Sequence, residues 1–258
     1  MPEVDTSLDA LAGGMKISAE DAEALAKALL PVARARVYPA SFISGGGKVL
    51  AAGRCGERGR LVIEMAKAEA PGAHSAKRLG AYSIAEAAWS FDELRALQGE
   101  LEFLVPRALG GATSAGLGDR LGSATVGHAR ATMGTGVAPV FAQQSIREMT
   151  RTHRSPQDVM ADAAWGVLAS GWREAWGADA DHLKSTGNVD RCAAAGFVLI
   201  TIDPGEHVDD EADGRSGSDL DAALDALPWG ALETAPADFR ERHVKSPDDE
   251  IRFVRAAA

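Results

Sequence analysis

Residues 177–185 read Gly-Ala-Asp-Ala-Asp-His-Leu-Lys-Ser, and residues 201–211 read Thr-Ile-Asp-Pro-Gly-Glu-His-Val-Asp-Asp-Glu. Each run follows a short apolar, strand-like segment and places acidic side chains beside a histidine. Imidazole can bind a divalent metal, and a neighbouring carboxylate can orient that ligand or move a proton. Two such clusters predict a metal-assisted enzyme site at one rim of an α/β sheet or barrel.

Strand-like and helix-like segments alternate on either side of these runs. Residues 137–142 and 197–202 are apolar and short enough for strands, and a helix is expected to begin with Ser155 as N-cap and Pro156 at its first position. This alternation favours βαβ units with a parallel sheet, in which ligands bind at the carboxyl ends of the strands. The pattern does not separate a closed barrel from an open sheet.

The first hundred residues predict a small region of mixed helix and strand. Its expected elements are a helix over 15–30 with Ser18 as N-cap and ended by Pro31, a hairpin formed by 49–52 and 61–65, and a helix over 81–97. Three glycines at 45–47 predict a flexible turn, because no Gly-Lys-Ser/Thr follows to make a phosphate-binding loop. We therefore expect an N-terminal α+β region over 1–100 and a catalytic domain over 101–258.

Composition restricts the class of protein. The 258 residues carry a net charge of −10 and suffice for a sizeable core. An acidic chain without a basic patch is a poor candidate for binding nucleic acid or an anionic membrane, and no segment has the ~20 apolar residues of a membrane span. The N-terminus has no signal-peptide pattern, and two distant cysteines, Cys55 and Cys192, fit a reducing compartment. We expect a soluble, cytoplasmic protein.

Individual side chains then give candidate roles. Asp181 and His182 are the strongest pair, because charged groups crowded at a strand end need solvent, a metal or a ligand to compensate them. His207 is a second candidate metal ligand, although the Asp-Pro-Gly before it is also ordinary turn chemistry. Gln143 and Gln144 could donate hydrogen bonds to a polar substrate or could cap neighbouring backbone.

A glycine-rich run at 116–128 contains Arg120, whose planar guanidinium could bind a carboxylate or phosphate. The glycine spacing does not match a dinucleotide fingerprint. Lys184, two residues after His182, is another candidate cation for an acidic substrate.

Residues 116–208 resemble the tagaturonate epimerase family, metal-dependent enzymes that interconvert tagaturonate and fructuronate. The resembling segments are Gly-Asp-Arg-Leu-Gly at 118–122, Pro-Val-Phe-Ala-Gln-Gln-Ser-Ile-Arg-Glu-Met-Thr-Arg-Thr at 139–152, Ala-Asp-Ala-Asp-His-Leu-Lys at 178–184, and Phe-Val-Leu-Ile-Thr-Ile-Asp-Pro-Gly-Glu-His-Val-Asp at 197–209. The resemblance implies a TIM-barrel-like fold, a divalent cation such as Zn²⁺ or Mn²⁺, Asp181 as proton acceptor and His182 as a metal ligand.

The implied reaction inverts a carbon β to a ketone, whose proton is not acidic, so our hypothesis is retro-aldol cleavage followed by re-addition. Arg120 or Lys184 would bind the carboxylate of the ketouronate. Family members are longer, so the resemblance implies an incomplete barrel that could be a fragment or could pair with a second copy or a complementing chain. A metal-dependent aldolase, and a non-catalytic relative that binds only a small acid or a partner chain, remain alternatives.

Overall fold

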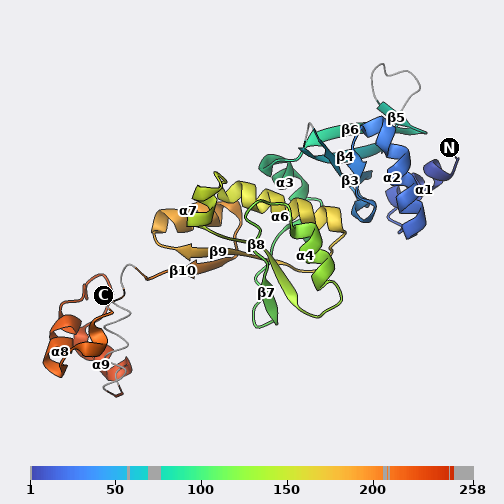
Figure 1. The fold of residues 1–258 in the computed structure, drawn as a ribbon. Helices are drawn as coiled ribbons and strands as arrows, with labels where there is room; N and C mark the ends of the chain where they lie inside the picture. Colours follow the sequence, from blue (N-terminus) through green and yellow to red (C-terminus); the bar gives the residue numbers. More distant parts are fainter. Residues whose placement is uncertain are drawn as a thin grey trace. The chain divides into compact units, whose positions relative to one another are not determined.

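The computed structural model describes residues 2–56, 59–68, 77–205, 208, 210–243 and 245–246. The chain divides into two compact units, Met1–Thr201 and Ile202–Ala258, which we describe separately (Figure 1). The expected boundary between residues 100 and 101 lies between the two sheets of the first unit. As a domain boundary it stays a prediction.

The first sheet is antiparallel. Its strands are β1 (Arg36–Val37), β2 (Ile43–Gly45), β3 (Lys48–Cys55), β4 (Gly59–Lys67), β5 (Lys77–Leu79) and β6 (Tyr82–Ala88), in the order β1-β3-β4-β6-β5 with β2 also paired to β3. The expected hairpin is therefore confirmed as β3 and β4. Gly46 and Gly47, with φ of 56° and 78°, form the tight turn between β2 and β3, a conformation that glycine adopts without strain.

Alternate side chains of the central strands face two different cores. Val49 and Ala51 of β3 pack against α1 (Pro2–Ala12) and α2 (Ala19–Ala33), whereas Leu50 and Ala52 belong to the core of the second half of the unit. This period of two is what a strand buried on both faces requires. The antiparallel sheet is thus a layer between the N-terminal helices and the rest of the unit.

Two sequence expectations in this region were wrong. Helix α2 begins after Ser18, whose hydroxyl accepts from the Asp21 amide at 3.0 Å, but it continues through Pro31 to Ala33. Pro31 lies near the end of the helix, where buried leucines on the same face outweigh the loss of its N–H. The expected helix over 81–97 is strand β6 followed by α3 (Phe91–Gln98), because Tyr82 and Ile84 alternate into the core opposite β4.

The second sheet confirms the alternation of strands and helices. Strands β7 (Ser114–Gly116), β8 (Ala138–Ser145), β9 (Gly177–Leu183) and β10 (Leu199–Ile202) lie in the order β10-β9-β8-β7, and β8 pairs in parallel with both β7 and β9. The connecting helices are α4 (Thr125–Thr132), α5 (Ile146–Arg151), α6 (Pro156–Ser170) and α7 (Thr186–Ala195). The short 3-10 turns of the unit are η1 (Pro39–Ser41) and η2 (Glu102–Leu104).

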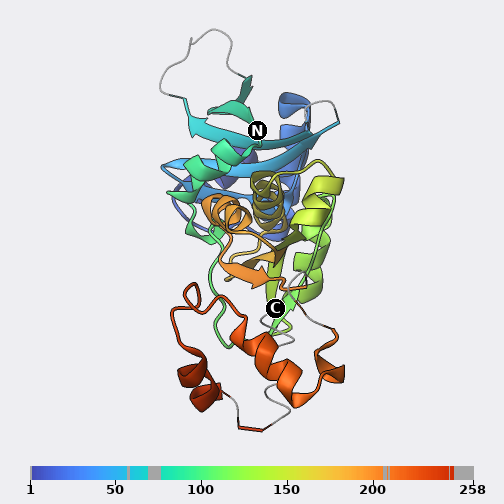
Figure 2. The same cartoon turned by 90° about the vertical axis from the view of Figure 1, so that its left-hand side faces the viewer.

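Helix α6 is the centre of the unit. It begins as expected: Ser155 accepts from the Asp158 amide, the Asp158 carboxylate accepts from the Ser155 amide, and Gly171 ends the helix with φ of 74°. It contacts β3 of the antiparallel sheet and β8 of the parallel sheet, and both views show it between the two sheets (Figures 1 and 2). Trp165 of α6 and, after the helix, Trp172 and Trp176 are buried.

The second unit is small and helical where the structure describes it. It contains the 3-10 turn η3 (Ala212–Gly214), α8 (Gly217–Asp225) and α9 (Pro236–His243). Leu220 and Leu224 form its core with Ala212. The described residues of both units include no helix with the length and apolar character that crossing a bilayer requires.

Candidate functional site

A cleft of about 720 Å³ lies at the carboxyl ends of the parallel strands. Its walls come from the loop after β7, the end of β8, helix α5 and the end of β9. The lining residues are Gly118, Asp119, Arg120, Leu121, Ser123, Gln143, Gln144, Glu148, Thr152 and Asp181. This edge is where an α/β sheet binds ligands, and it brings together four of the predicted site residues: Arg120, Gln143, Gln144 and Asp181.

Asp181 and His182 form a hydrogen-bonded pair at the end of β9. Nδ1 of His182 lies 2.7 Å from Oδ1 of Asp181, and the two side chains are 59 % and 26 % exposed. His182 has a φ of 55°, in the left-handed region, which costs a non-glycine residue roughly 1–3 kcal/mol. In the neutral imidazole the Nδ1–H donates to the carboxylate, which leaves the lone pair of Nε2 for a metal or a proton.

A row of hydrogen bonds crosses three strands beside this pair. Asp179 of β9 is 5 % exposed. It accepts from Nε2 of Gln143 at 3.1 Å and from the hydroxyl of Thr201 at 2.9 Å. Gly116 gives Gln143 its room, because a Cβ at that position would lie 2.2 Å from the amide oxygen. Gln143 is therefore committed to Asp179, a residue that sequence reasoning did not single out as part of the site.

Gln144 differs from its neighbour. The residue is 1 % exposed, and within the described residues neither its amide oxygen nor its amide nitrogen has a hydrogen-bond partner. Buried amides are nearly always hydrogen-bonded, so an unsatisfied one at a cleft marks a place for a ligand or an ordered water.

Arg120 lies at the mouth of the cleft and donates through Nε to Glu148 of α5. Glu148 also accepts from the Ser145 amide at 3.3 Å and so completes the capping box of α5. Burial alone would raise the pKa of Glu148, but the hydrogen bonds from Arg120 and the Ser145 amide hold that pKa below its ordinary value. Glu148 is thus an ionised anchor for Arg120.

Asp119 organises the loop that carries Arg120. Its carboxylate accepts from the backbone amides of Leu121, at 3.2 Å, and of Ala124. Burial would raise its pKa, yet the backbone amides of this loop, that of Ala124 foremost, outweigh burial and lower it. The Asp119 carboxylate therefore stays ionised and is committed to the loop's own backbone.

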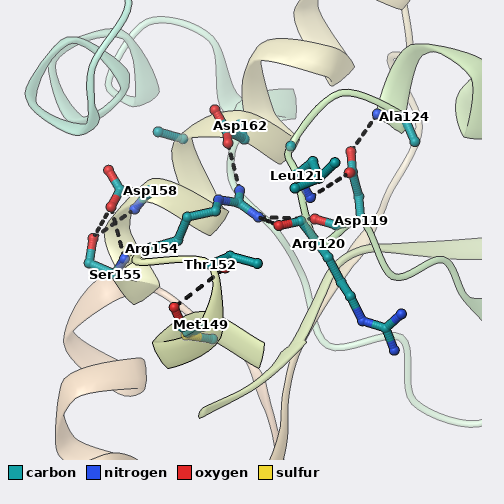
Figure 3. Close-up of polar contacts among 12 residues, drawn as sticks. Asp119, Arg120, Leu121, Ala124, Met149, Thr152, Arg154, Ser155, Asp158 and Asp162 are labelled. Atoms are coloured by element: carbon teal, nitrogen blue, oxygen red, sulfur yellow. Dashed lines mark hydrogen bonds and ion pairs between the residues drawn. The ribbon is translucent and has the colours of Figure 1, made fainter. Parts of the chain in front are cut away.

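Arg154 binds the backbone of the same loop. Figure 3 shows its guanidinium between Asp162 and the loop: Nη1 donates to the carbonyl oxygens of Asp119 and Arg120, both at 3.0 Å, and Nη2 donates to Asp162 at 2.6 Å. Arg60 of β4 pairs with the other carboxylate oxygen of Asp162 and donates to the carbonyl of Gly122. None of these three charged residues was predicted from the sequence.

Two predicted site residues lie elsewhere. Lys184 is exposed one residue after β9 and is not among the residues that line the cleft. His207 lies outside the described residues, so its candidate role stays a prediction. The described part of the chain gathers no group of three His, Cys, Asp or Glu side chains that could hold a metal ion. A protein metal site of this kind needs about three such donors, so Asp181 and His182 do not complete one.

Comparison with known proteins gives consistent matches. A family model described as tagaturonate epimerase matches residues 44–257. A curated tagaturonate/fructuronate epimerase from Thermotoga maritima is 45% identical over 117 residues, which cover 45% of this chain and 24% of that protein. Crystal structures of fructuronate-tagaturonate epimerase from Cohnella laeviribosi, native and with one glycerol, match with a TM-score of 0.70 and 25% identity over 92% of this chain and 49% of theirs. The chain thus spans at most about half the length of these relatives.

Proposed function

Because the chain belongs to the tagaturonate epimerase family, we propose that it forms part of an isomerase that interconverts D-tagaturonate and D-fructuronate. The observation that carries the proposal is the cleft at the carboxyl ends of the parallel strands, which is lined by Asp181, Arg120 and Glu148. Asp181 is paired with His182, and Arg120 is paired with Glu148. A carboxylate able to accept a proton and a cation able to bind a carboxylate are the two groups that a ketouronate needs.

We assign the roles as follows. Asp181 takes the proton of the hydroxyl on the carbon to be inverted, and the bond between that carbon and the carbon next to the ketone breaks. The electron pair passes into an enediolate, and the other fragment becomes an aldehyde. The aldehyde then turns over, the bond re-forms on its opposite face, and Asp181 returns the proton. Arg120 holds the carboxylate of the substrate while this happens.

We further propose that the working enzyme uses a divalent cation, Zn²⁺ or Mn²⁺, with His182 as one ligand. The remaining donors would come from outside the described residues, either from His207 or from a second copy or complementing chain. A TIM-barrel-like closure of the sheet in the complete enzyme, and work in the cytoplasm, belong to the same proposal.

The test is turnover of D-tagaturonate by the wild-type chain, by Asp181→Asn and by the control Asp190→Asn, which removes an exposed carboxylate of α7. We expect Asp181→Asn to abolish formation of D-fructuronate and Asp190→Asn to leave it unchanged. Reduction with borohydride during turnover should trap two three-carbon fragments. Inversion that proceeds with no trapped fragments but requires a nicotinamide would overturn the retro-aldol step.

Fragments that accumulate without inversion would identify an aldolase instead. A wild-type chain that binds D-tagaturonate without converting it would identify the binding-only alternative.

A further inference from the structure

The loop over residues 118–124, which we call the cleft loop, is held by a network of three largely buried charged side chains. Three of its carbonyl oxygens, those of Asp119, Arg120 and Gly122, accept from two guanidinium groups. Loop carbonyls usually face solvent, so three of them bound by arginine side chains are an unusual degree of restraint.

The charges that provide this restraint come from separate parts of the first unit. Arg60 belongs to β4 of the antiparallel sheet, Asp162 belongs to α6, and Arg154 lies just before α6. Their side chains are 21 %, 18 % and 12 % exposed, respectively. Asp162 compensates both cations. The guanidinium of Arg154 reaches the carboxylate through Nη2 and two carbonyls through Nη1, a planar span that the single nitrogen of an ammonium group does not provide.

Gly122 shows that the backbone is fitted to this network. Its φ is 68°, and a Cβ there would lie 1.8 Å from Oδ2 of Asp162 and 2.9 Å from Nη2 of Arg154. The close approach of the loop to the charges therefore requires glycine at this position. On the other side of the loop, the Asp119 carboxylate accepts the loop's own amides. Both kinds of backbone group in the loop are thus satisfied in one conformation.

Arg120 is the side chain that this conformation presents. Its backbone carbonyl is bound by Arg154, whereas its guanidinium points away from Arg154 in Figure 3 and pairs with Glu148 at the cleft. Burial lowers the pKa of Arg154 without removing its charge, because the pKa of an arginine lies far above neutral pH. Arg154 therefore stays charged near neutral pH.

We propose that Arg154, supported by Asp162 and Arg60, is a positioning residue that sets the affinity of the cleft for a ligand carboxylate by fixing the backbone of Arg120. The proposal rests on the proposed function in one respect, that Arg120 binds the carboxylate of a sugar acid. It adds that the antiparallel sheet, through Arg60, helps to build the carboxylate-binding part of the cleft.

The test is a double-mutant cycle read by calorimetric binding of D-tagaturonate. The proteins are the wild-type chain, Arg154→Lys, Arg120→Ala and the double variant, with Arg151→Lys, an exposed arginine at the end of α5, as the control. We expect Arg154→Lys to weaken binding about tenfold, since losing part of one charge-assisted interaction is about a factor of ten in affinity. In the Arg120→Ala background the same change should have no further effect, and Arg151→Lys should have none in either.

A general loss of structure would weaken binding equally in both backgrounds, and that result overturns the proposal. Unchanged binding in Arg154→Lys overturns it as well. If Arg154→Lys does not fold, Arg60→Lys takes its place in the cycle with the same expectation. A wild-type chain that neither binds nor converts D-tagaturonate refutes the proposed function, and this assignment with it. If the wild-type chain binds D-tagaturonate and the effects of Arg154→Lys and Arg120→Ala on affinity are additive, the positioning role of Arg154 is refuted, whereas the proposed function is not.

Discussion

Gln143 and Gln144 are neighbours of identical chemistry with opposite surroundings. The amide of Gln143 donates to the buried Asp179, whereas that of Gln144 has no hydrogen-bond partner among the described residues. A buried amide without a partner loses its hydration and gains nothing in return, which costs about 1–3 kcal/mol. Within a protein that folds stably, such a residue is best explained by a ligand or an ordered water that supplies the missing hydrogen bonds.

We therefore predict that Gln144→Met raises the free energy of unfolding by about 1 kcal/mol, because it removes the unsatisfied amide and keeps the side-chain volume. The matched change Gln143→Met should lower that free energy, because it takes a hydrogen bond from Asp179. Urea unfolding of both variants without ligand measures the difference. A loss of stability in Gln144→Met as large as that in Gln143→Met would show that the Gln144 amide is already satisfied.

The candidate site was only partly predictable at the scale of residues. Asp181 and the two glutamines could be found because each ends a strand-like segment, and polar groups there lie at the ligand-binding edge of the sheet. Arg120 could be found because it is the cation of a glycine-rich run. Arg60 and Gly122 are 62 residues apart, and Arg154 is 35 residues from Asp119. Such contacts follow from how two sheets pack on α6, which no local pattern encodes.

At the scale of elements, the signals that predicted correctly are those in which the backbone itself needs a particular residue. Ser155 and Pro156, which were predicted to begin α6, do begin it. The structure adds that glycines in the left-handed region end two helices: Gly171 ends α6, and Gly196 ends α7 with a φ of 96°. The segment 81–97 misled because alanine favours helices on its own, whereas pairing of Tyr82 and Ile84 with β4 decides the outcome in the folded protein. A cap is a local requirement, but a strand needs a partner from elsewhere in the chain.

The cleft loop and the start of α5 should make stability depend on pH. The pKa values of Asp119 and Glu148 are lowered in the folded chain, so each stabilises the fold while it is ionised in both states. That contribution is complete above the unfolded pKa values, about 4 for these groups, and is lost as the pH falls through the lower folded values. We expect the free energy of unfolding to decrease steadily below about pH 4.

The measurement is urea unfolding between neutral pH and the acid range for the wild-type chain and for Asp119→Asn with Glu148→Gln. The double variant should be less stable at neutral pH and should show a shallower loss in acid. Equal slopes for the two proteins would contradict the assignment of these carboxylates, because other acidic groups would then account for the whole dependence.

At the scale of the whole molecule, the match to the solved epimerase structures covers 92% of this chain but only 49% of theirs. The mixed α/β architecture and a parallel sheet were predicted from the alternation of strands and helices, and β8 does pair in parallel with β7 and β9. The strand order β10-β9-β8-β7 could not be predicted from that alternation. The complement of metal donors did not, since the described residues bring Asp181 and His182 together without a third ligand. Metal binding by Asp181 and His182 is therefore the property to measure.

Metal binding tests the role of His182 directly. We expect the chain to bind Mn²⁺ through Nε2 of His182, whose Nδ1–H is held by Asp181. Carboxylate–histidine pairs of this kind strengthen a ligand by about tenfold to a hundredfold, so His182→Ala should weaken Mn²⁺ binding in calorimetry by at least about tenfold. His153→Ala is the matched control, because His153 is also exposed and also has a left-handed backbone, with φ of 53°, but it follows α5 and is not the neighbour of Asp181 in β9. Mn²⁺ binding by the wild-type chain that both variants retain in full would mean that His182 is not a ligand.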